Sequence, residues 1–249
     1  AINHPVSAYI SAVSSITGTA NDPFSRLALL GRGAGIDFIE VGVFNNAPAI
    51  QRWWDGDGYD SASTFWIFAS STPEIAPPAG ASFNLATSTI PFISGVEYLF
   101  NARARDRAGN YTLPVATKTF IYDNVKPTVS ILQPPTLPGN TLSSLPTISG
   151  NSADDVALNR VEVRIKNNGL GLLWVPGSFP PNFLLAETDA SAWFPAAGTV
   201  SWSTGTFPAN FFADQVNYSV HARSVDRADN IANFAASTFT FTNQMPTSY

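Results

Sequence analysis

The chain has 249 residues, of which 45% are hydrophobic and only 12% charged, and its formal net charge at pH 7 is −5. This acidic balance argues against nucleic-acid binding, which needs clustered Lys and Arg, and no apolar run approaches the roughly 18 residues of a membrane helix. Cysteine is absent, which excludes thiol catalysis, a cysteine-ligated metal and disulfide bonds.

Short β-type runs separated by Gly, Pro, Asn and Ser follow one another along the whole chain, and no stretch keeps a helical period for three turns. The first half has such runs near residues 6–13, 15–19, 37–44, 65–69, 82–87, 97–105 and 116–122. The second half has them near residues 128–132, 147–150, 160–166, 184–187, 199–203, 217–225 and 237–241. About seven short strands in just over a hundred residues predict an all-β fold of antiparallel β-sandwiches.

The clearest stretch of the chain occurs twice. Residues 98–110 return as residues 218–230 at an offset of 120, and four further matches keep the same order. This duplication predicts two tandem domains, 1–124 and 125–249, joined by a short, stiff linker at 123–127. The matched residues Ile16 and Ile148 are 132 positions apart, whereas the matched Glu40 and Glu162 are 122 apart. The first copy therefore carries about ten extra residues between these two matches, within 23–35.

The inserted loop contains glycines at 31, 33 and 35, a pattern that resembles a phosphate-binding loop. No strand–loop–helix unit surrounds these glycines and no lysine follows them, so we interpret the segment as a flexible loop. We expect Leu27, Leu29 and Leu30 to plug the loop or to form a contact surface.

Alternation along the strands predicts which side chains face the two cores. Tyr98 and Tyr218 open the sixth strand of each copy, where a tyrosine corner would lie. Asp106 and Asp226 follow these strands and are expected to cap the backbone of the next turn. The full set of expected core residues is Ile39, Val41, Val43, Tyr98, Phe100, Phe120 and Tyr122 in the first copy, and Val161, Val163, Ile165, Tyr218, Val220, Phe239 and Phe241 in the second.

The order Pro-Thr-Val-Ser-Ile, Ile-Ser-Gly, Val-Glu-Val, Trp-x-x-Gly, Ser-Trp-Ser and Tyr-x-Val-x-Ala-x-x-x-Asp-x-Ala-x-Asn resembles the bacterial Ig-like repeats of large secreted and surface proteins. The resemblance covers nearly all of both copies; the second fits better, because the first has Ser82-Phe83-Asn84 in place of Ser201-Trp202-Ser203. It implies tandem Ig-like β-sandwich domains, an extracellular or cell-surface location and a structural or adhesive role. The family offers no catalytic residues to carry over.

Residues with catalytic or metal-binding chemistry are few. His4 lies in the N-terminal segment, and His221 is expected to point outward beside Arg223; neither has a serine elbow, a paired carboxylate or an H-E-x-x-H context, so we expect no enzyme. Asp55-Gly-Asp57-Gly-Tyr-Asp60 resembles the start of a calcium loop. The pattern lacks the Glu at its twelfth position, so an acidic turn is the favoured interpretation, with no metal or cofactor assigned.

Aromatic residues cluster between positions 53 and 68. Trp54 and Trp174 match each other and are expected to be equivalent core residues. Trp53 and Trp66 have no such explanation, and tryptophan beside a glycine turn can stack on sugar rings. They are the candidate sugar-stacking residues.

The outward face of the strand near residues 37–44 differs between the copies. The second copy presents Arg160, Glu162, Arg164 and Lys166 there, and the first presents Phe38, Glu40, Gly42 and Phe44. Exposed Phe38 and Phe44 would form a patch that soluble monomers avoid. We expect this face, with Leu27, Leu29 and Leu30, to contact another subunit or to fold under the inserted loop.

The two ends of the chain resemble the linker: residues 242–249 repeat the pattern of residues 123–130, and residues 2–7 read as a third version. The first residue is Ala1, so we expect either a removed leader or a window cut from a longer chain. The expected function is that of an extracellular structural protein, either a repeat segment of an adhesin stalk or a subunit of a surface fibre. Its partners would be further Ig-like repeats or other copies of itself. The alternative is a carbohydrate-binding module of a secreted protein, with glycans as partners.

Overall fold

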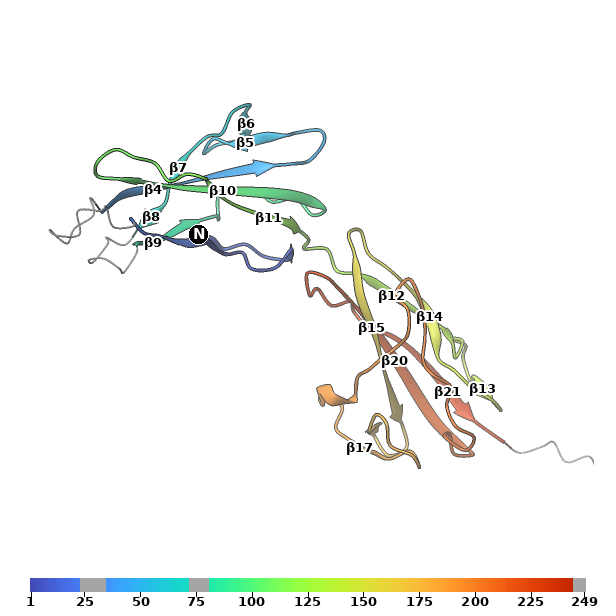
Figure 1. The fold of residues 1–249 in the computed structure, drawn as a ribbon. Coiled ribbons are helices and arrows are strands. Elements are labelled where there is room, and N and C mark those ends of the chain that lie inside the picture. The colour runs from blue at the N-terminus through green and yellow to red at the C-terminus, as the bar shows by residue number, and fades with distance from the viewer. Residues whose placement is uncertain (23–34, 72–80, 244–249) are drawn as a thin grey trace, which may run out of the picture. The chain divides into compact units, whose positions relative to one another are not determined.

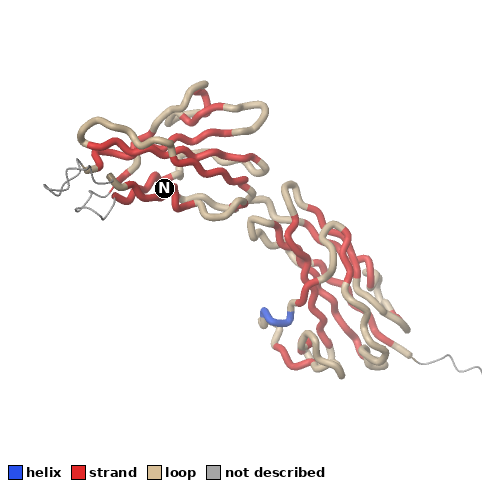
Figure 2. Tube along the Cα trace, in the orientation of Figure 1, coloured by secondary structure: helices blue, strands red, loops and turns tan. Residues whose placement is uncertain are grey.

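The computed structural model describes residues 1–22, 35–71 and 81–243, and its ribbon is drawn in Figure 1. The inserted loop with Leu27, Leu29 and Leu30 and the end of the chain from residue 244 lie outside the described residues. The chain divides into two compact units, Ala1–Asn124 and Val125–Tyr249, called the first and second unit below. Strands and loops make up almost all of both units (Figure 2), and no helix within the described ranges is long and apolar enough to span a membrane.

In the first unit, two sheets enclose one core. The smaller sheet has the strand order β1-β3-β9-β8, and the larger has the order β2-β11-β10-β4-β5-β6, with β7 paired to β4. The long central strands β4 and β10 pair antiparallel, whereas β2 joins β11 in parallel. The strands are β1 (Ile2–His4), β2 (Tyr9–Ile10), β3 (Ser15–Ala20), β4 (Ile36–Asn45), β5 (Arg52–Trp54), β6 (Tyr59–Ser61), β7 (Ile67–Phe68), β8 (Ser70–Ser71), β9 (Ala81–Ala86), β10 (Val96–Asp106) and β11 (Ala116–Tyr122).

The second unit repeats this plan. Its smaller sheet has the order β12-β14-β19, and its larger sheet has the order β13-β21-β20-β15-β16-β17, with β18 paired to β15. A three-residue 3-10 helix, η1 (Ala190–Ala192), precedes β18. The strands are β12 (Thr128–Gln133), β13 (Thr141–Leu142), β14 (Ser149–Ala153), β15 (Leu158–Asn167), β16 (Leu172–Trp174), β17 (Phe183–Leu185), β18 (Phe194–Pro195), β19 (Ser201–Ser203), β20 (Val216–Asp226) and β21 (Ala235–Phe241).

Both units are therefore antiparallel β-sandwiches whose larger sheet extends the central strands with further short ones, as in Ig-type folds. The expected core register is confirmed at most positions: Ile39, Val41, Val163 and Tyr218 are each 0–1% exposed. Tyr122 and Phe241, also expected in the cores, are only partly buried at the ends of their strands.

Three sequence-based expectations differ from the structure. Of the expected strand at 6–13, only the two residues of β2 are extended, and β1, which precedes this run and joins the other sheet, was not expected. Residues 2–7 are not a third linker, because Ile2 pairs with Gly18 as Ile131 pairs with Gly150. Ile2 is thus equivalent to Ile131, and Pro5 to Pro134 rather than Pro127. The strand expected at 184–187 is present as β17, but it begins one residue earlier and ends two residues earlier.

Candidate functional sites

The two units share three sets of side-chain contacts, which equivalent residues make in both. The backbone N–H of Ile93 donates to the hydroxyl of Tyr98 (2.9 Å), and that of Ala213 donates to the hydroxyl of Tyr218 (3.0 Å). The tyrosine corner is thereby confirmed. Burial raises the pKa of both tyrosines, so the phenol stays protonated and holds the loop before its strand.

The turn after each of these strands is also built alike. Asp106 accepts hydrogen bonds from the backbone and side-chain amides of Asn110 (both 2.8 Å). Asp226 accepts from the backbone N–H groups of Ala228 and Asn230, and from the Asn230 side chain. The expected capping role of both aspartates is confirmed.

A third shared contact lies on the outer face of each larger sheet. The guanidinium of Arg103 lies over the ring of Trp66 and bonds Glu40 at 2.6 Å. In the second unit, Arg223 lies over Trp193 and forms an ion pair with Glu162 at 2.8 Å. Burial raises the pKa of Glu162, but the hydrogen bonds and positive charges of Arg160 and Arg223 outweigh burial and hold this pKa below its usual value. The strand registers make these residues equivalent, because Phe68 pairs with Glu40 as Pro195 pairs with Glu162.

Sequence reasoning missed this tryptophan–arginine–glutamate stack. Trp66 and Trp193 are 127 residues apart, whereas the other matched residues around them in the two copies are about 120 apart. The two tryptophans therefore did not align in the comparison of the copies. The arginines did align, at an offset of 120 residues, and so did the glutamates, at an offset of 122. These two matches were the signal from which the shared contact could have been predicted. One face of Trp66, a candidate sugar-stacking residue, is therefore in contact with Arg103.

The other candidate residues of the first unit lie on the same outer face. Trp53 packs against Phe44 with ring centroids 5.0 Å apart, and its ring also lies over Gly42. Phe38 contacts Phe68 (5.1 Å) and Tyr111 (6.3 Å). The expectation that Phe38 and Phe44 are exposed is wrong, because aromatic side chains of the same unit cover both to intermediate burial.

The open aromatic surface of the first unit consists of other rings. Phe68 is 66% exposed and Tyr111 is 41% exposed. Beside them, Arg105 and Asp37 form an exposed ion pair at 3.7 Å, and the Arg105 guanidinium lies 5.4 Å from the Phe38 ring centroid. We call Phe38, Phe68, Tyr111, Arg105 and Asp37 the aromatic face.

The aromatic face has no aromatic counterpart in the second unit. By strand register, Arg160, Pro195 and Ile231 occupy the positions of Phe38, Phe68 and Tyr111. Contacts that both units keep serve the sandwich itself. Features that only one unit has are the candidates for a function of that unit.

His221, expected to point outward, does lie on the outer face of its sheet, but it is only 8% exposed. Arg164 donates through Nε to His221 Nδ1 (3.2 Å), and Phe234 packs on the imidazole with ring centroids 5.0 Å apart. Burial, followed by the positive charge of Arg164, lowers the pKa of His221 to about 4. A neutral imidazole that accepts a hydrogen bond from arginine is a structural group rather than a catalytic base.

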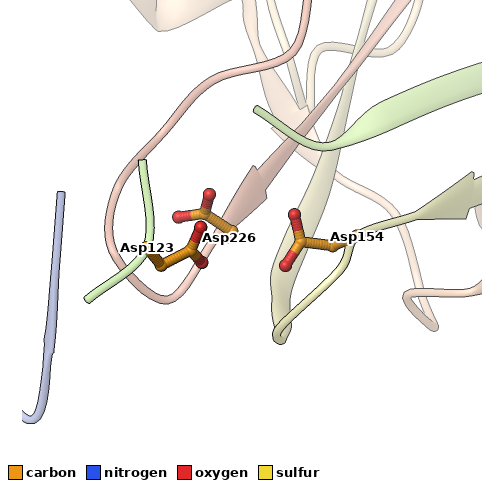
Figure 3. A group of neighbouring side chains, drawn as sticks. All are labelled: Asp123, Asp154 and Asp226. Carbon is orange, nitrogen blue, oxygen red and sulfur yellow. The ribbon is translucent and has the colours of Figure 1, made fainter. Parts of the chain in front are cut away.

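Two groups of acidic residues are candidate metal ligands. Asp55 accepts hydrogen bonds from the backbone N–H groups of Asp57 and Gly58, so the segment from Asp55 to Asp60 is an acidic turn between β5 and β6. Figure 3 shows a different group: carboxylate oxygens of Asp123, Asp154 and Asp226 lie within 4.8 Å of one another. Asp123 and Asp226 are 0% exposed, and Asp226 already accepts three hydrogen bonds from its own turn, so the arrangement alone does not define a metal site.

The second unit has a pocket lined by aromatic rings. Its volume is about 300 Å³, and its lining includes Trp174, Phe179, Phe194, Phe207 and Phe211. Trp174 and Phe211 are 8% and 3% exposed, whereas Phe179 is 60% exposed. The pocket therefore has a buried aromatic floor and an open rim. Sequence reasoning identified Trp174 as a core residue but did not identify this pocket.

No protein-family model matches the chain, and no curated protein matches it. Among solved structures, the fibronectin(III)-like modules of Clostridium thermocellum CbhA align with 100% of this chain and 97% of their own, at 13% identity and a TM-score of 0.42. A tetra-tandem repeat from the extending region of a large adhesion protein aligns at 14% identity and a TM-score of 0.31, and a 1.5-MDa bacterial ice-binding adhesin at 18% and 0.37.

The two adhesin matches cover 96% and 95% of this chain but only 48% and 62% of those structures. The chain thus spans about half to two thirds of their length. Its structural neighbours are fibronectin III-like modules and tandem repeats of bacterial adhesins, the kind of module that the sequence resembles. Identities this low describe a likeness of fold alone.

Proposed function

We propose that this chain is a pair of structural repeats in an extracellular bacterial protein, either a segment of an adhesin stalk or a subunit of a surface fibre, without catalytic activity. One observation carries the proposal: the residues that recur in both units are used for packing and turn geometry. The tyrosine corner, the aspartate–asparagine turn and the tryptophan–arginine–glutamate stack each recur in place. Contacts that only stabilise each repeat are what a protein needs when its function is to provide length and spacing.

The surface composition supports the same proposal. Only 12% of the residues are charged, against about 25% in ordinary soluble domains. Contacts with further repeats or with other copies would cover surface that a monomer keeps solvated. Phe38, Phe44, Leu27, Leu29 and Leu30 stay predicted as part of such a contact, with the open rings Phe68 and Tyr111 added beside Phe38.

Immunogold electron microscopy of intact cells that make the protein tests this function, with antibody raised against residues 125–249. We expect gold on the cell surface or along filaments, and sedimentation of the native material as a long array or fibre. Gold confined to the interior of sectioned cells, together with a free monomer in the native material, would refute the proposal.

A second candidate function is glycan binding by the aromatic face. Phe68 and Tyr111 present open rings, and the neighbouring Arg105–Asp37 pair offers both donors and acceptors. Apolar rings that supply contact area, with a few polar groups that fix orientation, are the usual composition of a ligand surface. Trp53 and Trp66 serve this proposal less well, since each already packs against another side chain.

A glycan array separates the two candidates. If the aromatic face binds sugar, Phe68→Ala should abolish a signal that the matched exposed variant of the second unit, Leu184→Ala, leaves intact. Trp66→Ala and Trp53→Ala should reduce it only through loss of folded protein. An array without signal for the unaltered chain would leave the structural function as the sole candidate.

A further inference from the structure

We propose that the aromatic pocket of the second unit is a binding site for a small, uncharged, apolar ligand of about the size of one aromatic ring. This site goes beyond the proposed structural function, which needs no ligand. Pockets of this kind, with aromatic walls and an opening to solvent, are where proteins hold small molecules. Its volume of about 300 Å³ lies at the lower end of the range found for such sites, roughly 300–1,000 Å³.

The pocket arises from a local difference between the two units. Phe83 and Trp202 are equivalent, because Phe83 pairs with Gly18 as Trp202 pairs with Gly150. Two residues further along each chain segment, Leu85 corresponds to Thr204, and three residues further along, Ala86 corresponds to Gly205. The second unit thus has two smaller side chains here.

The second unit also has one extra residue at this place. The N–H of Thr87 donates to the Ser14 carbonyl, as the N–H of Phe207 donates to the Pro146 carbonyl. These two bonds are equivalent, because Ser14 and Pro146 each lie two residues before the matched Ile16 and Ile148. Thr87 lies four residues after Phe83, but Phe207 lies five after Trp202. The smaller side chains and the added residue together leave the space above Trp174 open.

The walls of the pocket are rings that hold one another in place. Trp174 makes edge-on contacts with Phe194 and Phe211, each with ring centroids 5.1 Å apart. Phe207 packs on Phe211 at 4.6 Å. A pocket whose walls are fixed by mutual packing does not collapse when it is empty, so ligand binding need not pay for ordering it.

Three of the four polar side chains in the lining, those of Trp174, Ser178 and Thr204, are already hydrogen-bonded, and the fourth is the exposed Thr206. This low polar capacity decides the class of ligand. Thr204 accepts a hydrogen bond from the Ile148 N–H (2.9 Å), and the Trp174 indole N–H donates to the Ser178 carbonyl (3.3 Å). The Ser178 hydroxyl donates to the Val175 carbonyl and accepts from the Asn182 N–H. Among the described residues, no charged side chain lines the pocket.

A sugar would lose hydrogen bonds to water here and recover few of them, because its several hydroxyls need partners and the exposed Thr206 is the one polar side chain of the lining left to provide them. An organic cation would find no carboxylate in the lining, although rings alone can attract it. An uncharged apolar ring gives up no hydrogen bonds on entry. Apolar cavities in proteins are known to take up benzene in this way.

Gly205 provides a sharp test of the site. A Cβ atom built on Gly205 meets no atom within 4 Å, although the residue lines the pocket. Gly205→Leu should therefore fill the pocket without displacing the backbone. Gly169→Leu is the matched control, since Gly169 is an exposed glycine of the same unit outside the pocket and its nearest neighbour is a side-chain atom at 3.4 Å.

The experiment titrates the full chain with fluorobenzene, followed by ¹⁹F NMR and by amide and indole shifts in ¹H–¹⁵N spectra. We expect saturable binding that shifts the Trp174 indole and Gly205 amide signals, at least tenfold weaker in Gly205→Leu and unchanged in Gly169→Leu. Phe179→Ala, which removes the exposed rim ring, should weaken binding about threefold and serves as the second variant if Gly205→Leu does not fold.

Absence of saturable fluorobenzene binding to the unaltered chain would overturn the proposal. So would binding that both pocket variants leave unchanged. Methyl β-glucoside and tetramethylammonium are titrated in parallel. If either binds at the Trp174 indole while fluorobenzene does not, the assigned class of ligand is wrong.

Discussion

The guanidinium carbon of Arg103 lies 4.1 Å from the ring centroid of Trp66. Its equivalent in the second unit, Arg223, lies 4.3 Å from the ring centroid of Trp193. Each arginine also bonds a glutamate on the neighbouring strand, Glu40 or Glu162. The ring shields the ion pair from water, and the pair fixes the segment that carries the tryptophan to the face of the sheet.

Trp66→Ala and Trp193→Ala should each lower the free energy of unfolding of their unit by about 1–3 kcal/mol, from the lost cation–π contact and the uncovered apolar area. Chemical denaturation measures this, with Phe65→Ala as the control, expected to cost about 0.5 kcal/mol or less because that ring is 42% exposed. Equal effects of Trp66→Ala and Phe65→Ala would show that the stack adds nothing.

The tyrosine corners give a second prediction. Tyr98→Phe and Tyr218→Phe remove the oxygen that accepts the N–H of Ile93 or Ala213. We expect each substitution to cost about 0.5–1.5 kcal/mol, the net contribution of a typical hydrogen bond, because both bonds are only partly buried. Tyr111→Phe, at an exposed position, is the control and should have almost no effect. Thermal unfolding of the three variants side by side is sufficient, and unchanged midpoints for the two corner variants would contradict the prediction.

The sequence predicted the framework of the fold because that framework depends on periodic patterns. Alternation fixed the register of the long strands β4, β10, β15 and β20, and the duplication supplied each assignment twice. Two or three residues are too few to show a period of two, and for this reason the sequence missed the short strands β1, β5, β6, β8, β13, β16 and β18.

The candidate sites were predicted less well, because each depends on contacts between distant segments. Sequence position alone left Trp66 unexplained, although its partner Arg103 was visible in the repeat. Phe38 was expected to be exposed because nothing in the sequence shows that Phe68 packs over it. The pocket is lined both by Gly205 and by the ring of Phe194, and no local sequence pattern joins these two positions.

Gly150 is required for close packing between strands, which leads to a third prediction. A Cβ atom there would lie 1.9 Å from the carbonyl oxygen of Ser130 and 2.5 Å from the Trp202 ring. Gly150→Ala should therefore lower the free energy of unfolding by about 3 kcal/mol or more, as overpacking of a rigid interior does.

The matched control for Gly150→Ala is Gly205→Ala, where the added methyl group meets open space. Gly205→Ala should leave the free energy of unfolding unchanged or raise it by up to about 1 kcal/mol, because alanine reduces the conformational entropy of the unfolded chain. Urea denaturation of both variants provides the comparison. A Gly150→Ala protein as stable as Gly205→Ala would mean that β12 and β19 can move apart at little cost.

His221 predicts a dependence of stability on pH. Its pKa is about 4 in the folded chain, against an ordinary value of 6.5, so between these values the unfolded chain binds more protons than the folded one. Stability contributed by the neutral imidazole is present above pH 6.5 and is lost as the pH falls toward 4, by up to about 3 kcal/mol. Arg164 and Lys166 face the imidazole and oppose its protonation, whereas Glu187 favours it.

His221→Asn tests this prediction, because it removes the titrating group and keeps an acceptor for Arg164. Urea denaturation at intervals between pH 7 and pH 5 should show a decline for the unaltered chain that the variant lacks. The carboxylates with lowered pKa, such as Glu162 and Asp106, lose their contribution only at lower pH and do not obscure this window. Parallel curves for the two proteins would show that His221 is not the group responsible.

The last prediction is that each unit folds alone. Each has its own core, built around Tyr98 and Phe120 in the first unit and around Tyr218 and Phe239 in the second. No strand pairing among the described residues joins the two units. Units of 124 and 125 residues are large enough to bury a sufficient core without disulfides, and the chain has no cysteine to form them.

Fragments 1–124 and 125–249, produced separately, should each show dispersed amide spectra and a single cooperative unfolding transition. The second fragment should bind fluorobenzene as the full chain does, because every residue that lines the pocket belongs to it. The first fragment serves as the negative control in that titration. A fragment that is unfolded in isolation and regains structure only when the other is added would show that the duplicated halves depend on each other, and the repeat could not then act as a freestanding module in a longer array.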